Sequence, residues 1–599
     1  MSETGLDIDA LEAKYREERE KRLTADRGQF LLMEGALRRY GDDPYTRPEP
    51  REPRAQTVKV LVVGAGFGGL IMAARLRDAG IDDFLLVDEA GDVGGVWYWN
   101  RYPGASCDID AYTYLPLLEE TGYMPTMRYC SQEEIYGYAR LLAKRYGVYD
   151  RALFHTAVRV MRWDDGAGQW VVTTDRGDVI RAQFVVTAIG GAYSRPKLPT
   201  IEGVDAFEGV SFHTSRWNYD YTGGGPGQEL AGLGDKTVAI IGTGATALQC
   251  VPWLARSAKK LYVVQRTPNA VGPRPNPPTD PEWFKDLPRG WQMARFENFA
   301  LQTSGVPVDE DLIQDGWSAI FYELIKPGQD QSLSPEERAA AAKVADLRKM
   351  DKLRDRVDEI VADPALARRL KPYYHYLCKR PGFHDEYLQC FNRPNVELVD
   401  TEGRGLKRIT PTGFVADGVE YEVDCIIHAT GFLTADDPYT TRAGFEVIGA
   451  GGRSLGEKWK DGPETFHGVT SHGFPNLLIF PDASQQAVTS FNFMHTLIES
   501  SAHAAYVIGE LDKRGVDYFD VDPEAERNWV AAVMEHSHDR DAFYNACTPG
   551  RYSNEGHVAE RSAKAASYPL KTMDFFALWN AWRDAGELTG LELHSRSTR

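Results

Sequence analysis

Long hydrophobic runs are missing from this sequence. No apolar stretch among the 599 residues approaches the roughly 20 needed to span a bilayer, so neither a membrane-spanning segment nor a membrane partner is predicted. Residues 1–5 do not begin a basic stretch that leads into an apolar one, so no secretory signal is expected. Together these absences predict a cytoplasmic protein.

Cysteine is scarce and dispersed. The seven cysteines are odd in number, and the nearest two in sequence are Cys378 and Cys390. The sequence therefore contains no CxxC or CxxxxC redox pair and no cysteine cluster for zinc, and no metal site is predicted. This pattern favours free thiols in a reducing compartment over a disulfide framework.

Positive charge is in deficit. Lys and Arg number 68 against 87 Asp and Glu, which gives a net charge of −19 at pH 7. A surface this acidic repels phosphate backbones and argues against a nucleic-acid partner. Hydrophobic residues make up 43% of the chain, which excludes wholesale disorder and leaves enough apolar side chains for several cores.

The first residues precede any regular α/β pattern. Residues 6–23 are typical of an amphipathic helix, because Asp7 or Asp9 can cap it and several glutamates are followed four residues later by Lys or Arg. Residues 40–57 contain four prolines among charged residues and are interpreted as a linker. Residues 1–56 are therefore predicted to form an N-terminal helical extension and linker.

Two units of strand, glycine turn and helix follow. The strand Val58–Val63 leads into the run Gly64–Gly69 with GxGxxG spacing. The strand Thr237–Ile241 leads into Gly242–Ala247, where alanine takes the place of the third glycine. A lone GxGxxG is a weak signal, but a strand before it and a helix after it are the context of a dinucleotide-binding turn. The glycines allow a pyrophosphate to approach the helix N-terminus closely.

The residues that follow the second strand of each unit distinguish the two nucleotides. In the first unit these are Asp88 and Glu89, and a carboxylate there accepts hydrogen bonds from ribose hydroxyls and repels a 2′-phosphate, which suits FAD or NAD. In the second unit they are Arg266 and Thr267, which suit the 2′-phosphate of NADP(H). One site of each kind predicts an enzyme that passes hydride from NADPH to a flavin.

The predicted fold class is α/β, with two Rossmann-like dinucleotide-binding domains, one for FAD and one for NADP. Residues 57–205 are predicted to be the first part of the FAD-binding domain, and residues 206–395 the NADP-binding domain with a helical insertion at about 275–371. Residues 396–599 are predicted to be the second part of the FAD-binding domain and a C-terminal region. The insertion is inferred from a proline-dense stretch followed by a helix-like pattern over 335–371.

Two further strings carry a resemblance to a known family. Residues 94–108 hold a glycine pair and a dense group of aromatic residues that could wall a flavin ring, and Phe207–Trp217 spells FxGxxxHxxxW. With this string between two Rossmann motifs, the chain resembles the type I Baeyer–Villiger monooxygenases over roughly residues 57 to 500. The N-terminal helix and Ser490–Phe493 resemble the branch that acts on bulky cyclic ketones. Further matches are Gln265–Pro268, Lys379–Pro381 and Ala429–Phe432.

The resemblance implies a reaction and two cofactors, FAD and NADP(H). Reduced flavin and O₂ form a C4a-peroxyflavin, which converts an apolar, bulky cyclic or polycyclic ketone to a lactone or ester. Arg380 matches the active-site arginine of the family, Asp108 the carboxylate that orients it, and Lys379 a partner of Arg266 at the 2′-phosphate. His213 matches a residue expected to be structural or coupling, and it is not the chemical base.

The predicted cofactor-binding residues fall into two groups. Those of the first unit are Gly64, Gly66, Phe67, Gly69, Asp88, Glu89, Val96, Trp97, Asp108, Tyr114 and Val158. Those of the second unit are Gly242, Thr243, Gly244, Ala245, Thr246, Ala247, Gln249, Arg266, Thr267 and Lys379.

Several alternatives stay open at this level. A flavin-dependent disulfide reductase is disfavoured because it needs a close cysteine pair. An N- or S-hydroxylating flavin monooxygenase and a non-catalytic flavoprotein share the nucleotide pattern and would be distinguished by product analysis and NADPH consumption. Pro481–Gln486 departs from the Gly-Pro-x-Gly of many family members, so the substrate-lining loop around 481–495 is left unassigned. The ketone, the regiochemistry and the oligomeric state are also left open.

Overall fold

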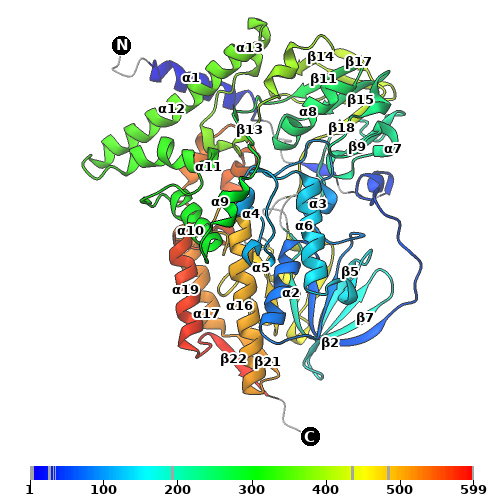
Figure 1. Cartoon of the computed structure of the whole chain (residues 1–599), viewed down its shortest axis with the longest axis vertical. Helices are drawn as coiled ribbons and strands as arrows, with labels where there is room; N and C mark the ends of the chain where they lie inside the picture. The colour runs from blue at the N-terminus through cyan, green and yellow to red at the C-terminus, as the bar shows by residue number, and fades with distance from the viewer. Residues whose placement is uncertain are drawn as a thin grey trace.

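The computed structural model describes residues 6–23, 29–31, 33, 35–190, 195–433, 438–481 and 486–595. Residues 1–5, in which no secretory signal was expected, and residues 482–485 of the unassigned loop lie outside the described residues. Two separate sheets with helices around them form the body of the molecule, one in the lower half of Figure 1 and one at its upper right. The predicted α/β class is confirmed.

The larger sheet contains the first glycine unit. Its strands are β2 (Ala55–Val63), β3 (Phe84–Val87), β4 (Ala152–Leu153), β5 (Val158–Asp164), β6 (Gln169–Thr174), β7 (Val179–Thr187), β19 (Glu446–Ile448) and β20 (Leu477–Ile479). They lie in the order β19-β5-β6-β7-β2-β3-β4, with β20 paired to β7. The strands around β2 are parallel, whereas β6 is antiparallel to both β5 and β7.

The continuous apolar runs Val60–Val63 at the end of β2 and Phe84–Val87 in β3 reflect burial on both faces of this sheet. Val60 and Val62 pack toward α2 (Phe67–Asp78) and α16 (Phe493–Arg514), whereas Leu61 and Val63 pack on the opposite face with Trp163 of β5. The helix α6 (Gln132–Arg145) adds to the first of these cores. The carboxyl end of β2 therefore delivers the first glycine turn between two filled cores.

The smaller sheet contains the second glycine unit. Its five strands are β9 (Val210–His213), β10 (Thr237–Ile241), β11 (Lys260–Gln265), β14 (Val396–Asp400) and β18 (Cys425–His428). All of them are parallel, in the order β14-β11-β10-β18-β9, and α8 (Ala245–Ser257) packs on them. The predicted boundary at residue 395 falls inside this sheet, because strand pairing draws β14 and β18 to β11 and β10. We propose a boundary after β18.

A set of helices lies between β12 (Val271–Gly272) and β13 (Gly382–Phe383), within the range where the sequence predicted a helical insertion. They are α9 (Pro281–Lys285), α10 (Trp291–Thr303), α11 (Gly316–Ile320), α12 (Pro335–Ile360) and α13 (Pro364–Leu370). The predicted helix over 335–371 is two helices, because Asp363 caps a new helix that has Pro364 in its first turn. In Figure 1, α12 extends away from the sheets at the upper left.

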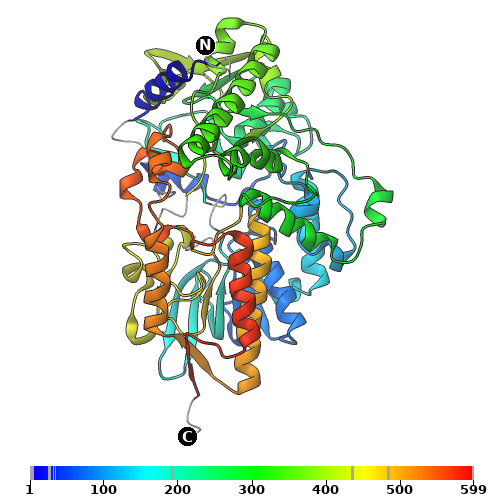
Figure 2. The same ribbon diagram turned by 90° about the vertical axis from the view of Figure 1, so that its left-hand side faces the viewer.

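Helices lie near both ends of the described chain. The helix α1 (Ile8–Glu20) is capped by Asp7, as predicted, and lies beside α12 in Figures 1 and 2. The C-terminal helices are α17 (Pro523–Glu535), α18 (Asp541–Ala546) and α19 (Thr572–Ala585), and α19 runs alongside α16. Over the described part of the chain, no helix has both the length and the apolar character needed to cross a membrane.

One disulfide joins Cys378 and Cys547, contrary to the expectation of free thiols throughout. The other five cysteines are free and buried. The bonded pair is separated by 169 residues in sequence, yet the two Cα atoms lie 5.2 Å apart. No spacing rule connects residues so far apart in the chain, so only the folding of the C-terminal segment against residues 376–380 could reveal this pair.

Removing this bond is expected to lower the thermal stability. A cross-link that closes a loop of this length restricts the unfolded chain by up to about 5 kcal/mol in the chain-entropy model. The double variant Cys378→Ala/Cys547→Ala should therefore melt several degrees below the wild type in scanning calorimetry of the FAD-loaded protein. Cys390→Ala, which removes a free buried thiol, is the matched control. A double variant that melts with the wild type would contradict the expectation.

Candidate active site

One cavity of about 2310 Å³ connects the two glycine units. The predicted site residues that line it are Gly64, Gly66, Phe67, Asp88, Glu89, Val96, Trp97, Asp108, Tyr114, Val158, Ala245, Thr246, Gln249 and Arg380. The predicted residues outside its lining are Gly69, Gly242, Thr243, Gly244, Ala247, Arg266, Thr267 and Lys379. The sequence therefore singled out part of the wall of a single large cavity, together with a second group of residues that do not line it.

The first glycine turn has room for a dinucleotide and for no side chain. Gly64 has a φ of +112°, and a Cβ added to it would lie 2.2 Å from the carbonyl oxygen of Ala188. Gly66 faces Gly95, where a Cβ would lie 2.8 Å from the Gly66 Cα. Two stretches of bare backbone thus meet at the N-terminus of α2, whose N–H groups carry partial positive charge. This cradle fits the pyrophosphate of FAD.

The two acids after β3 differ in what they contact. Both oxygens of Asp88 accept backbone hydrogen bonds, Oδ2 from Ala65 at 2.6 Å and Oδ1 from Ala90 at 2.8 Å. Burial raises the pKa of Asp88 to about 6, against the lowering effect of these bonds. Glu89 is half-buried, lines the cavity and pairs with Arg195 at 3.0 Å. Asp88 therefore stabilises the turn through its backbone contacts, whereas Glu89 forms a side-chain ion pair at the cavity wall.

The aromatic segment forms one wall of the cavity. Trp97 in α3 (Val96–Trp99) donates from Nε1 to the hydroxyl of Tyr114 in α4 (Ala111–Tyr114) at 2.8 Å. Burial holds the pKa of Tyr114 well above its usual value, so the hydroxyl stays protonated. Two flat side chains locked to each other in this way can form a rigid surface beside a flavin ring.

Arg380 and Asp108 form an ion pair at the cavity. The Arg380 Nη2 lies 2.6 Å from the Asp108 Oδ1, and the guanidinium carbon lies 5.0 Å from the ring centroid of Trp317 in α11. A guanidinium keeps its charge at any physiological pH. Because a carboxylate and an aromatic ring both hold it, this cation has a defined position in the cavity wall.

The second glycine turn leaves space at its middle glycine. A Cβ on Gly242 would lie 2.4 Å from the carbonyl oxygen of Ala429, whereas a Cβ on Gly244 would meet nothing within 4 Å. The open position at the N-terminus of α8 is where a second pyrophosphate can approach. Gln249 of α8 accepts a hydrogen bond from the Tyr102 hydroxyl at 2.9 Å and donates to the Ser106 carbonyl at 2.9 Å. These bonds fix α8 to the aromatic segment of the first unit.

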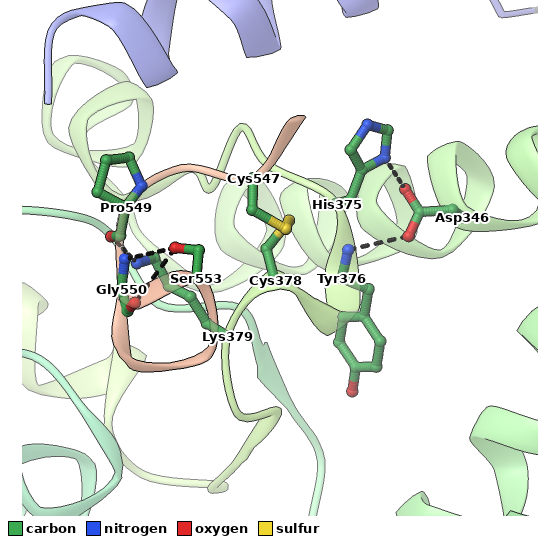
Figure 3. The surroundings of a disulfide bond; sticks show 9 residues. All are labelled: Asp346, His375, Tyr376, Cys378, Lys379, Cys547, Pro549, Gly550 and Ser553. Carbon is green, nitrogen blue, oxygen red and sulfur yellow. Dashed lines mark hydrogen bonds and ion pairs between the residues drawn. A yellow bond between two sulfur atoms is a disulfide. The ribbon is translucent and has the colours of Figure 1, made fainter. Parts of the chain in front are cut away.

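The predicted 2′-phosphate residues meet a segment that the sequence did not single out. The Arg266 Nη2 lies 3.4 Å from the Glu555 Oε2. The Lys379 Nζ donates to the Pro549 carbonyl at 2.8 Å, next to the disulfide of Cys378 and Cys547 in Figure 3. Residues 547–556, here termed the C-terminal loop, therefore contact both cations. No sequence feature of this loop predicted the contact, because a cysteine such as Cys547 does not by itself identify its bonding partner.

His213 is fully buried at the end of β9. Its Nδ1 is 2.9 Å from the Ser215 hydroxyl, and its Nε2 is 3.0 Å from the Gly431 carbonyl oxygen. Burial lowers its pKa well below the usual value, so the ring stays neutral. A neutral ring bridging β9 to the segment after β18 supports the coupling or structural role expected for it.

Sequence reasoning missed several apolar residues of the cavity lining. Trp317, Leu377, Phe491 and Phe493 line the cavity, and the Trp317 and Phe491 ring centroids are 5.9 Å apart. Phe491 and Phe493 were noted in the sequence only as part of a family-like string. Trp317 carried no signal, because it belongs to a helical insertion whose packing no local pattern predicts.

Comparisons with known sequences identify relatives along nearly the whole chain. A family model described as pyridine nucleotide-disulphide oxidoreductase matches residues 58–281, which hold both glycine turns. The chain is 47% identical to the neopentalenolactone D synthase of Streptomyces avermitilis, over 98% of this chain and 99% of that protein. It is 43% identical to Baeyer-Villiger monooxygenase 4 of Dietzia sp., over 98% of this chain and 96% of that protein.

Solved structures give the same picture. The polycyclic ketone monooxygenase of the thermophilic fungus Thermothelomyces thermophila superimposes with a TM-score of 0.90 at 37% identity, covering 98% of this chain and 99% of that one. The complex of OTEMO with FAD and NADP gives a TM-score of 0.72 at 26% identity, over 91% of this chain and 100% of that one. The similarity therefore extends over both sheets and the cavity between them.

Proposed function

This chain belongs to the Baeyer–Villiger monooxygenases, and from that premise we propose that its own substrate is a bulky polycyclic ketone, which it converts to a lactone. Enzymes of this family consume a ketone, O₂, NADPH and a proton and release an ester or lactone, NADP⁺ and water. The observation that carries the proposed substrate class is the apolar side of the cavity, where the Trp317 ring lies against the Arg380 guanidinium and Leu377, Phe491 and Phe493 line the same cavity. The relatives named for pentalenolactone synthesis and for polycyclic ketones support the same class.

FAD and NADP(H) are the cofactors of this enzyme. When bound, the flavin takes up hydride from NADPH and activates O₂. We propose that the first glycine turn holds the FAD pyrophosphate, with Glu89 toward the ribose and Trp97 and Tyr114 toward the flavin ring. The backbone contacts of Gly64, Gly66 and Gly95 support this assignment.

The second nucleotide site is proposed around the turn that begins at Gly242. Gly244 leaves space for the NADP pyrophosphate, and Arg266, Thr267 and Lys379 supply one hydroxyl and two cations for the 2′-phosphate. Arg380, held by Asp108, is proposed to stabilise negative charge that develops beside the substrate carbonyl. The ion pair at 2.6 Å supports a fixed position for this cation.

A cytoplasmic location is also proposed for this enzyme. The five free, buried cysteines and the requirement for NADPH support it. The bond between Cys378 and Cys547 is compatible with such a location because both residues are shielded from soluble reductants. Fractionation of the producing cells checks this proposal, and recovery of the enzyme outside the cytoplasm would contradict it.

A panel of ketones tests the proposed substrate class. The purified yellow protein is incubated with NADPH and fused polycyclic, macrocyclic, monocyclic and linear ketones of matched hydrophobicity, and products are identified by mass. Fused polycyclic ketones should gain one oxygen atom with the highest kcat/KM. Preference for small monocyclic or linear ketones would contradict the substrate class but leave the family assignment intact.

A further inference from the structure

The N-terminal arm, residues 6–23, reaches the proposed NADPH site. We propose that Arg22 of this arm is a positioning residue for the 2′-phosphate of NADPH, acting through Thr267, and so contributes to the choice of NADPH over NADH. This inference rests on the proposed function, because it takes Thr267 to be part of the 2′-phosphate site. Arg22 is almost fully buried, with 4% of its side chain exposed, so it is no ordinary surface cation.

Arg22 contacts the end of β11 at two points. Its Nε lies 3.0 Å from the Thr267 Oγ1 and 3.2 Å from the Arg266 carbonyl oxygen. A hydroxyl has one hydrogen to donate and lone pairs to accept. Because the Thr267 oxygen accepts from Arg22, its hydrogen is directed away from the arm and can be donated to an anion. Arg22 therefore sets the orientation of the hydroxyl that is proposed to meet the phosphate.

The same threonine is tied to the second glycine turn. The Thr243 hydroxyl donates to the Thr267 carbonyl at 2.8 Å, and the Asn269 side chain donates to the Thr243 carbonyl at 3.0 Å. The contacts of Arg22 and Thr243 hold Thr267 from two sides. A shift of the arm would thus move a residue that is bonded directly to the nucleotide turn.

Arg22 is itself held in place. Its Nη1 lies 2.5 Å from the Glu18 Oε2 and 2.8 Å from the Glu18 carbonyl oxygen. Partial burial opposes ionisation of Glu18, but bonds from Arg22, Lys14 and Lys21 lower its pKa to about 2. Across the contact, Gly403 has a φ of +90°, and a Cβ there would lie 2.5 Å from the Arg22 Cγ. The ion pair with Glu18 and the absence of a Cβ at Gly403 together hold the Arg22 side chain in this position.

The rest of the arm is anchored to the helical insertion and to the C-terminal loop. The hydroxyl of buried Tyr15 accepts from the Arg354 Nη1 of α12 at 3.0 Å, and Lys343 of α12 pairs with Glu12. At the other end, a Cβ on Gly556 would lie 2.8 Å from the Leu23 Cδ2. The arm is therefore docked along its length, and Arg22 approaches Thr267 from a fixed direction.

Binding of adenosine 2′,5′-bisphosphate tests the proposal without turnover. Titration calorimetry of the FAD-loaded protein compares this probe with NAD⁺, which lacks the 2′-phosphate. Arg22→Ala should lower the affinity for the bisphosphate by about tenfold, which corresponds to the loss of one hydrogen bond to a polar group. It should leave the affinity for NAD⁺ within about twofold of the wild-type value. Arg22→Lys, which keeps a donor and a charge, should recover part of the loss. In turnover, KM for NADPH should rise while kcat changes little.

Lys21→Ala is the matched control, because Lys21 also pairs with Glu18 but makes no contact with Thr267 among the interactions described. It should bind both probes as the wild type does. Wild-type affinity in Arg22→Ala, or equal losses for both probes, would overturn the proposal. Arg266→Ala is run in parallel. If this variant also keeps full affinity for the bisphosphate, the proposed phosphate site itself fails, whereas a loss confined to Arg266→Ala removes only the role of Arg22.

Discussion

Replacement of Arg380 by alanine is expected to lower the rate of lactone formation by about 10²–10³-fold while NADPH still reduces the flavin. This magnitude is typical for the loss of one fixed group that stabilises developing negative charge in a water-excluded site. Arg380 is suited to such a role because its guanidinium is permanently charged and lies 2.6 Å from the Asp108 carboxylate. Flavin reduction should survive, since hydride transfer from NADPH moves charge onto the ring and not onto the ketone.

The two half-reactions can be measured separately. Anaerobic mixing with NADPH reports flavin reduction by absorbance, and mass analysis of aerobic mixtures reports lactone. Oxygen consumption without lactone should rise in the variant, with hydrogen peroxide as the product. Arg380→Lys is the conservative control, and it should retain part of the activity because it keeps the charge while losing the planar fork. Full lactone formation by Arg380→Ala would remove the proposed role.

Asp108→Asn is a useful companion to these variants. The amide keeps the size of the side chain but loses the charge that holds Arg380. We expect a smaller loss of lactone formation than in Arg380→Ala, because the cation is still present but less well positioned.

The second large effect is expected at Arg266. Arg266→Ala should raise KM for NADPH by about 10–100-fold, because a charge-assisted hydrogen bond to an anion contributes about 1.5–3 kcal/mol. KM for NADH should change little, since that nucleotide has no 2′-phosphate to lose a contact. Initial rates with each reductant, at a saturating ketone concentration, give the two values.

Glu555 provides the matched control for this experiment. Its carboxylate lies 3.4 Å from the Arg266 guanidinium and would compete with a phosphate for it. Glu555→Gln should therefore lower KM for NADPH modestly, in the opposite direction to Arg266→Ala. Equal changes in KM for NADPH and NADH in Arg266→Ala would contradict the assignment of the phosphate site.

Local patterns predicted the two glycine turns well. In each, a β-branched strand ends at a glycine with a φ near +113°, and a Cβ there would collide with the carbonyl oxygen of a residue that follows a neighbouring strand, Ala188 or Ala429. The positive φ belongs to the turn itself and is signalled by consecutive residues, whereas the carbonyl oxygen that excludes a Cβ comes from a distant part of the chain. The N-terminal helix was predicted for the same reason, because its Asp7 cap and its glutamate–lysine pairs are local.

The pairing of β14 and β18 with the second sheet was not predicted, so the predicted boundary at residue 395 falls inside that sheet. Both strands are short, and their sequences do not state which sheet they join. The different contacts of Asp88 and Glu89 could not be predicted either. Two adjacent carboxylates are equivalent in the sequence, and only the folded backbone shows that Asp88 is the one that accepts hydrogen bonds from the turn.

Local spacing predicted two nucleotide-binding units that pass hydride from NADPH to a flavin, and the oxidation of a ketone was predicted from the resemblance of short strings to a known family. These properties depend on short runs, in which a strand, a turn and a helix are contiguous. Only the tertiary structure decided that Cys378 bonds to Cys547, that Trp317 faces Arg380 and that Arg22 reaches Thr267. Such contacts join residues 63 to 245 positions apart, and their existence depends on the packing of every element between them.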